Sequence, residues 1–189
     1  IKSSAASDVY KRQETGNPYV DWRAVFTQKW NRELIFGYQK TSYNWRVATI
    51  PLGVGGRAYG GVAITQKLVD AFAMDTEHGG RYPITGYQAD GSPVIDPQSG
   101  YDESGFTSFT HPILGSTKST YNMYLNREPR FYASIGFDRG TFEIDDKILT
   151  LQLRGGELHG STLKETDEYQ SCTGYLCQKW IHKSSTYNL

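Results

Sequence analysis

The sequence lacks several features, and each absence excludes a class of protein. It has no apolar run approaching the roughly 18 residues of a transmembrane helix, and its mean hydropathy is −0.56. It has no charge excess, because 20 basic side chains balance 20 acidic ones. This balance argues against a nucleic-acid binder, which needs a basic stripe, and against a polybasic membrane anchor. With only two cysteines, it cannot form a disulfide-dense scaffold.

Aromatic side chains and glycine are abundant instead. Aromatics make up 14% of the 189 residues, with 14 Tyr and 4 Trp, and there are 20 Gly. Charged residues are slightly below the usual quarter. The length fits one domain or a large piece of one, with a folded core and many rings rather than a disordered tail.

The first residues differ in character from the rest. The stretch from Ser3 to Gln13 resembles a translated linker that recurs at the ends of assembled metagenomic reads. We therefore expect residues 1–13 to be a non-native segment and residues 14–189 to be the protein proper. The alternative is a genuine polar N-terminal segment. Either way, we expect the true N-terminus and any export signal to lie outside this chain.

The two cysteines, Cys172 and Cys177, are close in the sequence. Ordinary packing as free thiols is the simplest interpretation. A local disulfide is an alternative, and so is a zinc site that adds His182. The zinc alternative lacks the paired Cys and His spacing of structural sites.

Hydrophobic periodicity predicts a mixed α+β chain that is irregular, with few helices and short strands. Helices are expected over Tyr19–Trp30 and Thr65–Met74. Strands are expected over Glu33–Tyr38, Arg130–Phe137, Thr141–Ile144, Ile148–Leu153 and Tyr175–Ile181. The glycine-rich Gly53–Gly61 predicts a loop, and Arg81–Thr120 predicts a long irregular excursion. These elements close no compact sheet.

No catalytic or cofactor motif is convincing. Gly53–Ala58 formally meets G-x-G-x-x-A, but Pro51 precedes it and Gly60-Gly61 interrupts the helix that a dinucleotide site needs. The four histidines are dispersed and form no recognisable triad or zinc motif with their neighbours. The sequence predicts no catalytic residue, no cofactor and no metal, and therefore no enzyme.

Acidic residues leave two alternatives open. The neighbouring pairs Asp75/Glu77, Asp102/Glu103 and Asp145/Asp146 could serve a glycoside hydrolase, although that chemistry is decided by separation in space. The alternating Asp96, Gln98, Gly100 and Asp102 could ligate calcium, but the EF-hand pattern fails at Thr107. Solvated loop charges and Asx-type turns are the simpler interpretation of both sets.

The rings carry the binding hypothesis. Tyr38, Tyr43, Trp45 and Tyr59 fall within a short, mostly polar or glycine-rich stretch. Tyr and Trp combine a flat apolar face with a polar tip, which suits a sugar ring with an apolar face and a rim of hydroxyls. We predict that these four residues contact a ligand. The alternative is that most of them pack the loops together.

Four segments in order resemble the SusD/RagB family. They are Trp22–Thr27 followed by Glu33–Phe36, Thr65–Phe72, Asn126–Ile135 and Gly174–Ile181. The third, Asn-Arg-Glu-Pro-Arg-Phe-Tyr-Ala-Ser-Ile, resembles the family's "N-R-D-P-R-F-Y-A-T-I". Ile64 and Glu128 depart mildly from the family's Pro and Asp. We interpret Arg127, Pro129, Arg130 and Phe131 as structural residues of this motif.

The resemblance implies a fold and a function. Family members are mainly α, with a tetratricopeptide-like superhelix and a loop-rich C-terminal part. This chain would be an interior piece, mostly from the C-terminal half and truncated at both ends. Family members are surface glycan-binding lipoproteins of Bacteroidota that serve polysaccharide utilisation at the outer membrane.

By resemblance, then, the parent protein binds a glycan or peptide on the outer surface of the outer membrane. It delivers this nutrient to a SusC-type TonB-dependent transporter, and it meets the membrane only through an N-terminal lipid anchor absent from this chain. Two alternatives remain: a glycan-acting hydrolase from the same kind of locus, and a structural module that docks the transporter without a ligand.

Overall fold

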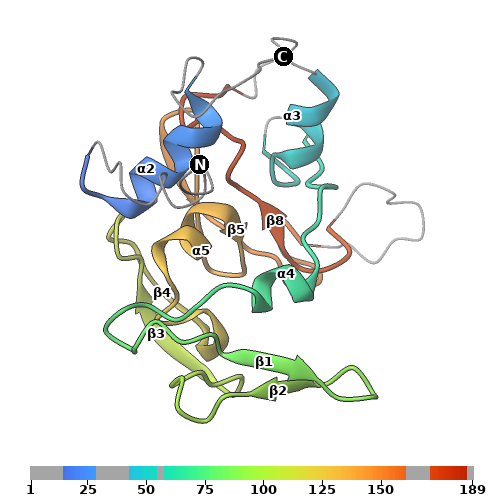
Figure 1. Ribbon diagram of the computed structural model, residues 1–189. Helices are drawn as coiled ribbons and strands as arrows, with labels where there is room; N and C mark the ends of the chain where they lie inside the picture. The colour runs from blue at the N-terminus through green and yellow to red at the C-terminus, as the bar shows by residue number, and fades with distance from the viewer. Residues whose placement is uncertain (1–14, 29–42, 55–57, 161–170, 187–189) are drawn as a thin grey trace, which may run out of the picture.

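The computed structural model describes residues 15–28, 43–54, 58–160 and 171–186 (Figure 1). The helices are α2 (Pro18–Thr27), α3 (Tyr43–Thr49), α4 (Gln66–Asp70) and α5 (Pro129–Ser134), with a 3₁₀ turn η1 (Asn122–Tyr124). The strands are β1 (Ile84–Tyr87), β2 (Pro93–Ile95), β3 (Phe106–Thr110), β4 (Thr117–Tyr121), β5 (Ile135–Gly136), β6 (Thr141–Ile144), β7 (Lys147–Thr150) and β8 (Leu176–Cys177). The predicted mixture of few helices and short strands is confirmed for this part of the chain. In these ranges, no helix is long and apolar enough to cross a membrane.

The strands form antiparallel pairs rather than one sheet. Three pairs are local hairpins, β1–β2, β3–β4 and β6–β7. The fourth joins β5 to β8, which are distant in sequence. This is why the predicted strands closed no compact sheet.

Helix α2 begins where its sequence predicts. The Asn17 side chain accepts hydrogen bonds from the backbone N–H groups of Tyr19 and Val20, and Pro18 occupies the first turn. The helix ends at Thr27, and Trp30 of the predicted range lies outside the described residues. Its inward face buries Tyr19 and Arg23.

The predicted strand Arg130–Phe137 is wrong. Pro129 opens helix α5, which runs to Ser134, and only Ile135 and Gly136 form a strand. Four successive residues from Phe131 to Ser134 are buried, so their apolar character reflects burial on every side. Such a short apolar run does not distinguish a helix from a strand.

The predicted irregular excursion over Arg81–Thr120 is also wrong, because it contains two hairpins. Strand β3 pairs with β4 over five residue pairs, from Phe106–Tyr121 to Thr110–Thr117. Threonine and serine dominate these strands, so the alternation of apolar and polar side chains is weak. Backbone pairing alone makes them strands.

The remaining predictions are mixed. The strand at Thr141–Ile144 is confirmed. In place of Ile148–Leu153, β7 runs from Lys147 to Thr150, and the predicted Tyr175–Ile181 shrinks to β8. Helix Thr65–Met74 shrinks to α4, because Met74 pairs with Arg127 in an isolated β-bridge. Helix α3 was not predicted, and the predicted strand Glu33–Tyr38 lies outside the described residues.

Two hydrophobic clusters form the core. The first gathers Tyr19, Ile64, Val69, Tyr124, Phe131, Tyr132, Ala133, Ile135, Phe137, Tyr175 and Cys177. The second gathers Ile50, Val54, Ala58, Phe142, Ile144, Leu151, Leu176 and Ile181. Neighbouring side chains on a strand point to opposite faces, so β8 lies between the clusters, with Cys177 in one and Leu176 in the other. Gly136 allows this approach, since a Cβ there would lie 3.1 Å from the Leu176 Cβ.

Arg127 links the motif around α5 to α4. Its Nη2 donates to the carbonyls of Val69 at 2.7 Å and Phe72 at 2.9 Å, at the end of α4. The guanidinium also lies over the rings of Tyr101 and Phe131. Only 1% of Arg127 is exposed, and burial lowers its pKa. The structural interpretation of this arginine is confirmed.

Candidate functional site

An exposed row of rings and one ammonium group joins α2 to α3. Trp45 on α3 and Trp180 after β8 have ring centroids 5.0 Å apart, and about two fifths of each residue is exposed. The Nζ of Lys179 lies 4.8 Å from the Trp180 centroid and 4.8 Å from that of Phe26 on α2. We call Phe26, Lys179, Trp180 and Trp45 the aromatic row. Both helices lie at the upper end of Figure 1.

The row combines the two features that a mixed polar and apolar ligand requires. The Trp45–Trp180 pair, tilted at an interplanar angle of 57°, leaves part of each indole exposed to solvent. Indole N–H groups and the Lys179 ammonium are hydrogen-bond donors at the edges of these rings. This arrangement is chemically suited to a ring with apolar faces and hydroxyl edges.

The turn that carries Lys179 and Trp180 is held from beneath. The backbone N–H of Ile181 donates to the Gln178 carbonyl at 3.1 Å and closes the turn. The backbone N–H of Gln178 donates to the Ser134 carbonyl at 2.9 Å, which attaches the turn to the end of α5. Gln178 and Ile181 are almost completely buried, while Trp180 between them points outward. The exposed ring therefore sits on a fixed backbone.

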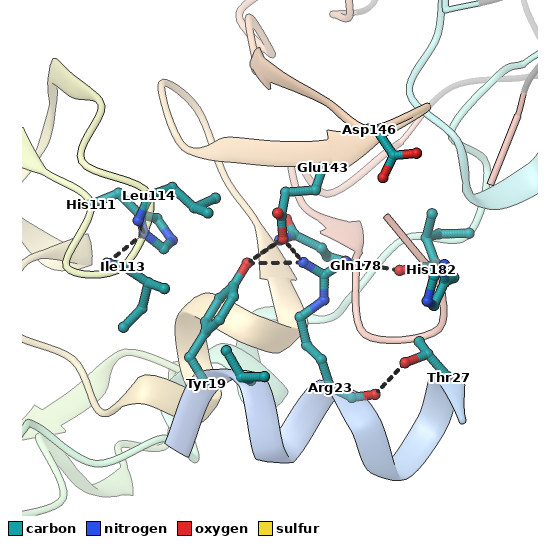
Figure 2. A network of polar contacts seen from close by, with 12 residues as sticks. Tyr19, Arg23, Thr27, His111, Ile113, Leu114, Glu143, Asp146, Gln178 and His182 are labelled. Carbon is teal, nitrogen blue, oxygen red and sulfur yellow. Dashed lines mark hydrogen bonds and ion pairs between the residues drawn. The ribbon is translucent and has the colours of Figure 1, made fainter. Parts of the chain in front are cut away.

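A buried polar network fixes the same turn to α2 (Figure 2). Nη2 of Arg23 donates to the Ile181 carbonyl at 2.9 Å, and Nη1 forms an ion pair with Glu143 on β6. The Tyr19 hydroxyl accepts from Arg23 at 3.1 Å and donates to Glu143 at 3.2 Å. Burial, with a smaller contribution from Glu143, raises the pKa of Tyr19 to about 12, so it remains a neutral donor. Arg23 thus positions the row without contacting its exposed face.

The structure places the four predicted ligand residues differently. Trp45 is in the aromatic row. Tyr59 is half-buried, and its backbone N–H donates to the Val47 carbonyl of α3 at 3.1 Å, so its backbone runs beside that helix. Tyr38 lies outside the described residues, as does the side chain of Tyr43 at the start of α3.

Sequence reasoning missed the other members of the row. Trp180 and Lys179 were interpreted as residues of a strand, and Phe26 as a residue of a helix, and none of the three was predicted to contact a ligand. The signal available was the Lys-Trp pair next to a short apolar run. What makes it a surface feature is the tight turn after β8, which no local pattern predicted.

The histidines have structural roles. His111 is 2% exposed, and its Nδ1 accepts from the backbone N–H groups of Ile113 and Leu114 at 3.2 and 3.1 Å (Figure 2). Burial, assisted by the Arg23 charge, lowers the pKa of His111 to about 4. His159 and His182 likewise accept from backbone N–H groups, and His78 contacts Asp75 within one turn.

Several of the paired carboxylates belong to turns. Asp145 and Asp146 connect β6 to β7, both with positive φ, as the two-residue turn of a tight hairpin requires. Asp75 and Asp102 accept hydrogen bonds from backbone groups two or three residues later. Asp96, one of the residues proposed to ligate calcium, forms an ion pair with Arg81 at 2.6 Å instead. Among the described residues, no group of three or more His, Cys, Asp or Glu could hold a metal ion.

Both cysteines are free thiols. Cys172 is exposed, whereas Cys177 is buried, and burial raises its pKa. The disulfide alternative is therefore wrong in this structure. The zinc alternative also finds no support, since these residues form no metal-binding group with His182 in the described part of the chain.

Comparison with known proteins identifies the relatives of this chain. A family model described as "SusD family" matches residues 22–189. No curated protein matches the sequence.

Solved structures resemble it as well. The protein BT4246 is 23% identical, with a TM-score of 0.61 over 87% of this chain and 26% of its own. A SusD-like protein, BF3747 from Bacteroides fragilis NCTC 9343, is 27% identical, with a TM-score of 0.53 over 95% of this chain and 32% of its own. The chain therefore spans about a quarter to a third of the length of the solved chains that it matches.

Proposed function

The chain belongs to the SusD family, and from this membership we propose that it is the part of a cell-surface protein that helps to bind a glycan for nutrient uptake. The observation that supports the proposal most directly is the exposed Trp45–Trp180 pair. Contiguous exposed apolar rings with polar groups at their rim are typical of binding surfaces.

Binding at the aromatic row needs no covalent chemistry. Each indole would cover the apolar face of one sugar, and Lys179 would donate to ring hydroxyls. Such contacts are modest, about 1–2 kcal/mol per ring, so the ligand would be held weakly enough to be released. Of the four residues predicted from sequence, we propose Trp45 as the main ligand contact. Tyr38, Tyr43 and Tyr59, which precede and follow it in the sequence, would add further contacts.

The finer parts of the proposal follow from the family. The parent protein would be a lipoprotein at the outer surface of the outer membrane of a Bacteroidota bacterium. It would pass its oligosaccharide, or a peptide, to a SusC-type TonB-dependent transporter. It would act by capture and transfer and not as an enzyme. This chain matches only about a quarter to a third of each solved relative, so these properties are proposed for the whole protein and not for this part alone.

Calorimetric titration of the full chain with a panel of neutral oligosaccharides tests the proposal. Replacing Trp45 or Trp180 by Ala should weaken binding roughly fivefold to thirtyfold, as loss of about 1–2 kcal/mol predicts. Tyr82→Ala is the matched control, because Tyr82 is a more exposed ring, at 58%, away from the row. It should leave the affinity unchanged.

Three outcomes would overturn the proposal. The first is equal affinity in the two tryptophan variants and the parent chain. The second is oligosaccharide turnover that disappears when one carboxylate is replaced, which would identify a hydrolase. The third is co-purification with a transporter while no glycan or peptide binds, which would identify a docking module.

A further inference from the structure

The β3–β4 hairpin has an outer face of rings and hydroxyls. In its register, Phe106 faces Tyr121, Ser108 faces Ser119 and Thr110 faces Thr117, and these six residues share one side of the ribbon. The alternate residues Phe109 and Thr120 point to the core, where Phe109 stacks on Tyr132. The hydroxyl residues are exposed, and Phe106 is 49% exposed.

At one end of this face the two rings contact each other at a tilt beneath an arginine. The centroids of Phe106 and Tyr121 are 4.1 Å apart. The Cζ of Arg154 lies 5.0 Å from the Phe106 centroid and 5.8 Å from that of Tyr121. An arginine stacked on aromatic rings loses little further freedom when it binds a ligand.

The same guanidinium is fixed along one edge. Its Nε donates to Asp138 at 2.7 Å, and Asp138 also accepts from the backbone N–H of Leu153 at 3.0 Å. The Asp138 side chain is only 8% exposed, whereas that of Arg154 is 42% exposed. Among the described residues, Asp138 is the only hydrogen-bond partner of the Arg154 guanidinium. In the described part of the chain, no group accepts from the terminal nitrogens Nη1 and Nη2, which form a donor fork.

The acidic groups nearby do not occupy this fork. Glu157 forms an ion pair with Arg139, and its backbone-facing oxygen accepts from the Arg154 backbone N–H at 3.3 Å. Asp138 engages the Nε edges of both arginines. The two arginines and two carboxylates of this cluster balance in charge, and the Arg154 side chain, 42% exposed, is the most exposed of the four.

From this geometry we propose that the Phe106 end of the hairpin binds a uronic acid residue of a glycan. The planar carboxylate would accept two parallel hydrogen bonds from Nη1 and Nη2 of Arg154. The sugar ring would contact the exposed part of Phe106 beside the guanidinium, since Phe106 is 49% exposed although Arg154 and Tyr121 lie against its ring. The proposal relies on the glycan-binding function only for the class of ligand.

This would be a second, charge-selective contact. In Figure 1 the β3–β4 hairpin lies towards the bottom of the molecule, and α3 lies at the top. The two surfaces can therefore be tested independently of each other.

The experiment titrates the full chain with trigalacturonic acid and with its methyl ester, which keeps the sugar rings and removes the charge. The acid should bind, and the ester should bind at least about tenfold more weakly. Arg154→Gln should reduce binding of the acid to the level of the ester. Phe106→Ala, which leaves the Asp138 ion pair intact, should weaken both ligands about fivefold. Arg139→Gln is the matched control within the cluster and should change affinity less than twofold.

Thermal unfolding of each variant shows whether the loss of Arg154 unfolds the chain. If Arg154→Gln does not fold, the affinities of the folded Phe106→Ala variant for the acid and the ester still test the proposal. Equal binding of acid and ester overturns the proposal. So does acid binding that is lost in Trp45→Ala but retained in Phe106→Ala, which would leave the aromatic row as the glycan site. Preference for a sulfated trisaccharide over trigalacturonic acid also overturns it, because the carboxylate would then not be the recognised group.

Discussion

Arg23 and Ile181, near opposite ends of the chain, are joined by a buried 2.9 Å hydrogen bond from a guanidinium nitrogen to a backbone carbonyl. Because Trp180 precedes Ile181, this bond and the Arg23–Glu143 ion pair hold the turn that presents the aromatic row. Arg23, which is itself only 7% exposed, therefore positions the exposed aromatic row.

Replacing Arg23 by Met should destabilise the protein by about 3 kcal/mol, because Glu143 loses its partner in a site where its side chain is only 16% exposed. Urea unfolding monitored by circular dichroism measures this. The double variant Arg23→Met with Glu143→Leu should recover part of the loss, since no charge is then buried alone. Lys147→Met, at the exposed pair with Asp145, is the control and should produce no resolvable change. A similar effect in Arg23→Met and Lys147→Met would contradict the role given to the buried pair.

Arg127→Lys should cost roughly 3 kcal/mol of unfolding free energy, although the charge is kept. Lysine lacks the planar guanidinium whose Nη2 serves the Val69 and Phe72 carbonyls while Nη1 serves that of Met123, and buried acceptors without donors are expensive. The matched control is Arg130→Lys in the same motif, because the Arg130 side chain is 42% exposed, pairs with nearby Glu128 and lies over the Trp22 ring. In urea unfolding monitored by circular dichroism, Arg130→Lys should lose much less unfolding free energy than Arg127→Lys. Equal losses would show that Arg127 acts only as a charge.

Stability should fall between pH 6.5 and about 4 through His111. Its folded pKa of about 4 lies below the unfolded value of 6.5, so in this range the unfolded chain binds the extra proton. The contribution is fully present above pH 6.5 and is lost as the pH falls, up to about 3 kcal/mol. His111→Asn keeps an acceptor near the Nδ1 position without the titration, so its unfolding free energy should depend less on pH. Parallel pH profiles of the parent chain and the variant would refute this assignment.

The two thiols should react at very different rates with a disulfide reagent such as Ellman's reagent. Cys172 is exposed and should react at once, whereas Cys177 is 4% exposed with a raised pKa and should react only as the protein opens. In the Cys172→Ser variant, the rapid phase should vanish and the slow phase should accelerate in urea. A rapid phase of full amplitude in that variant would mean that β8 is not packed between the two clusters.

Local signals predicted some elements well and others badly. Asn17 and Pro18 form a cap that depends only on neighbouring backbone groups, so the start of α2 was predictable. The run from Phe131 to Ser134 is apolar because the residues are buried on all sides, and such a run carries no period. The strands β3 and β4 contain only threonine, serine, aromatic residues and one lysine, Lys118, so a hydrophobic pattern does not reveal their backbone pairing.

The candidate site divides in the same way. Trp45 was predicted as a ligand residue because it lies among rings in a polar stretch, and it stays a prediction to be tested by binding. Its neighbour Trp180 comes from the other end of the chain, so only the fold could bring the two rings within 5.0 Å. The same holds for Arg154, which reaches Phe106 through the Asp138 ion pair.

The sequence by itself determined the charge balance, the cap of α2 and the family, because each depends on composition or on residues close together in the chain. The tertiary structure alone decided which rings are exposed side by side and which arginines are buried. Burial and long-range pairing arise only when distant segments pack against each other. Arg23 and Arg154 have identical side chains, but packing buries Arg23 and leaves Arg154 at the surface.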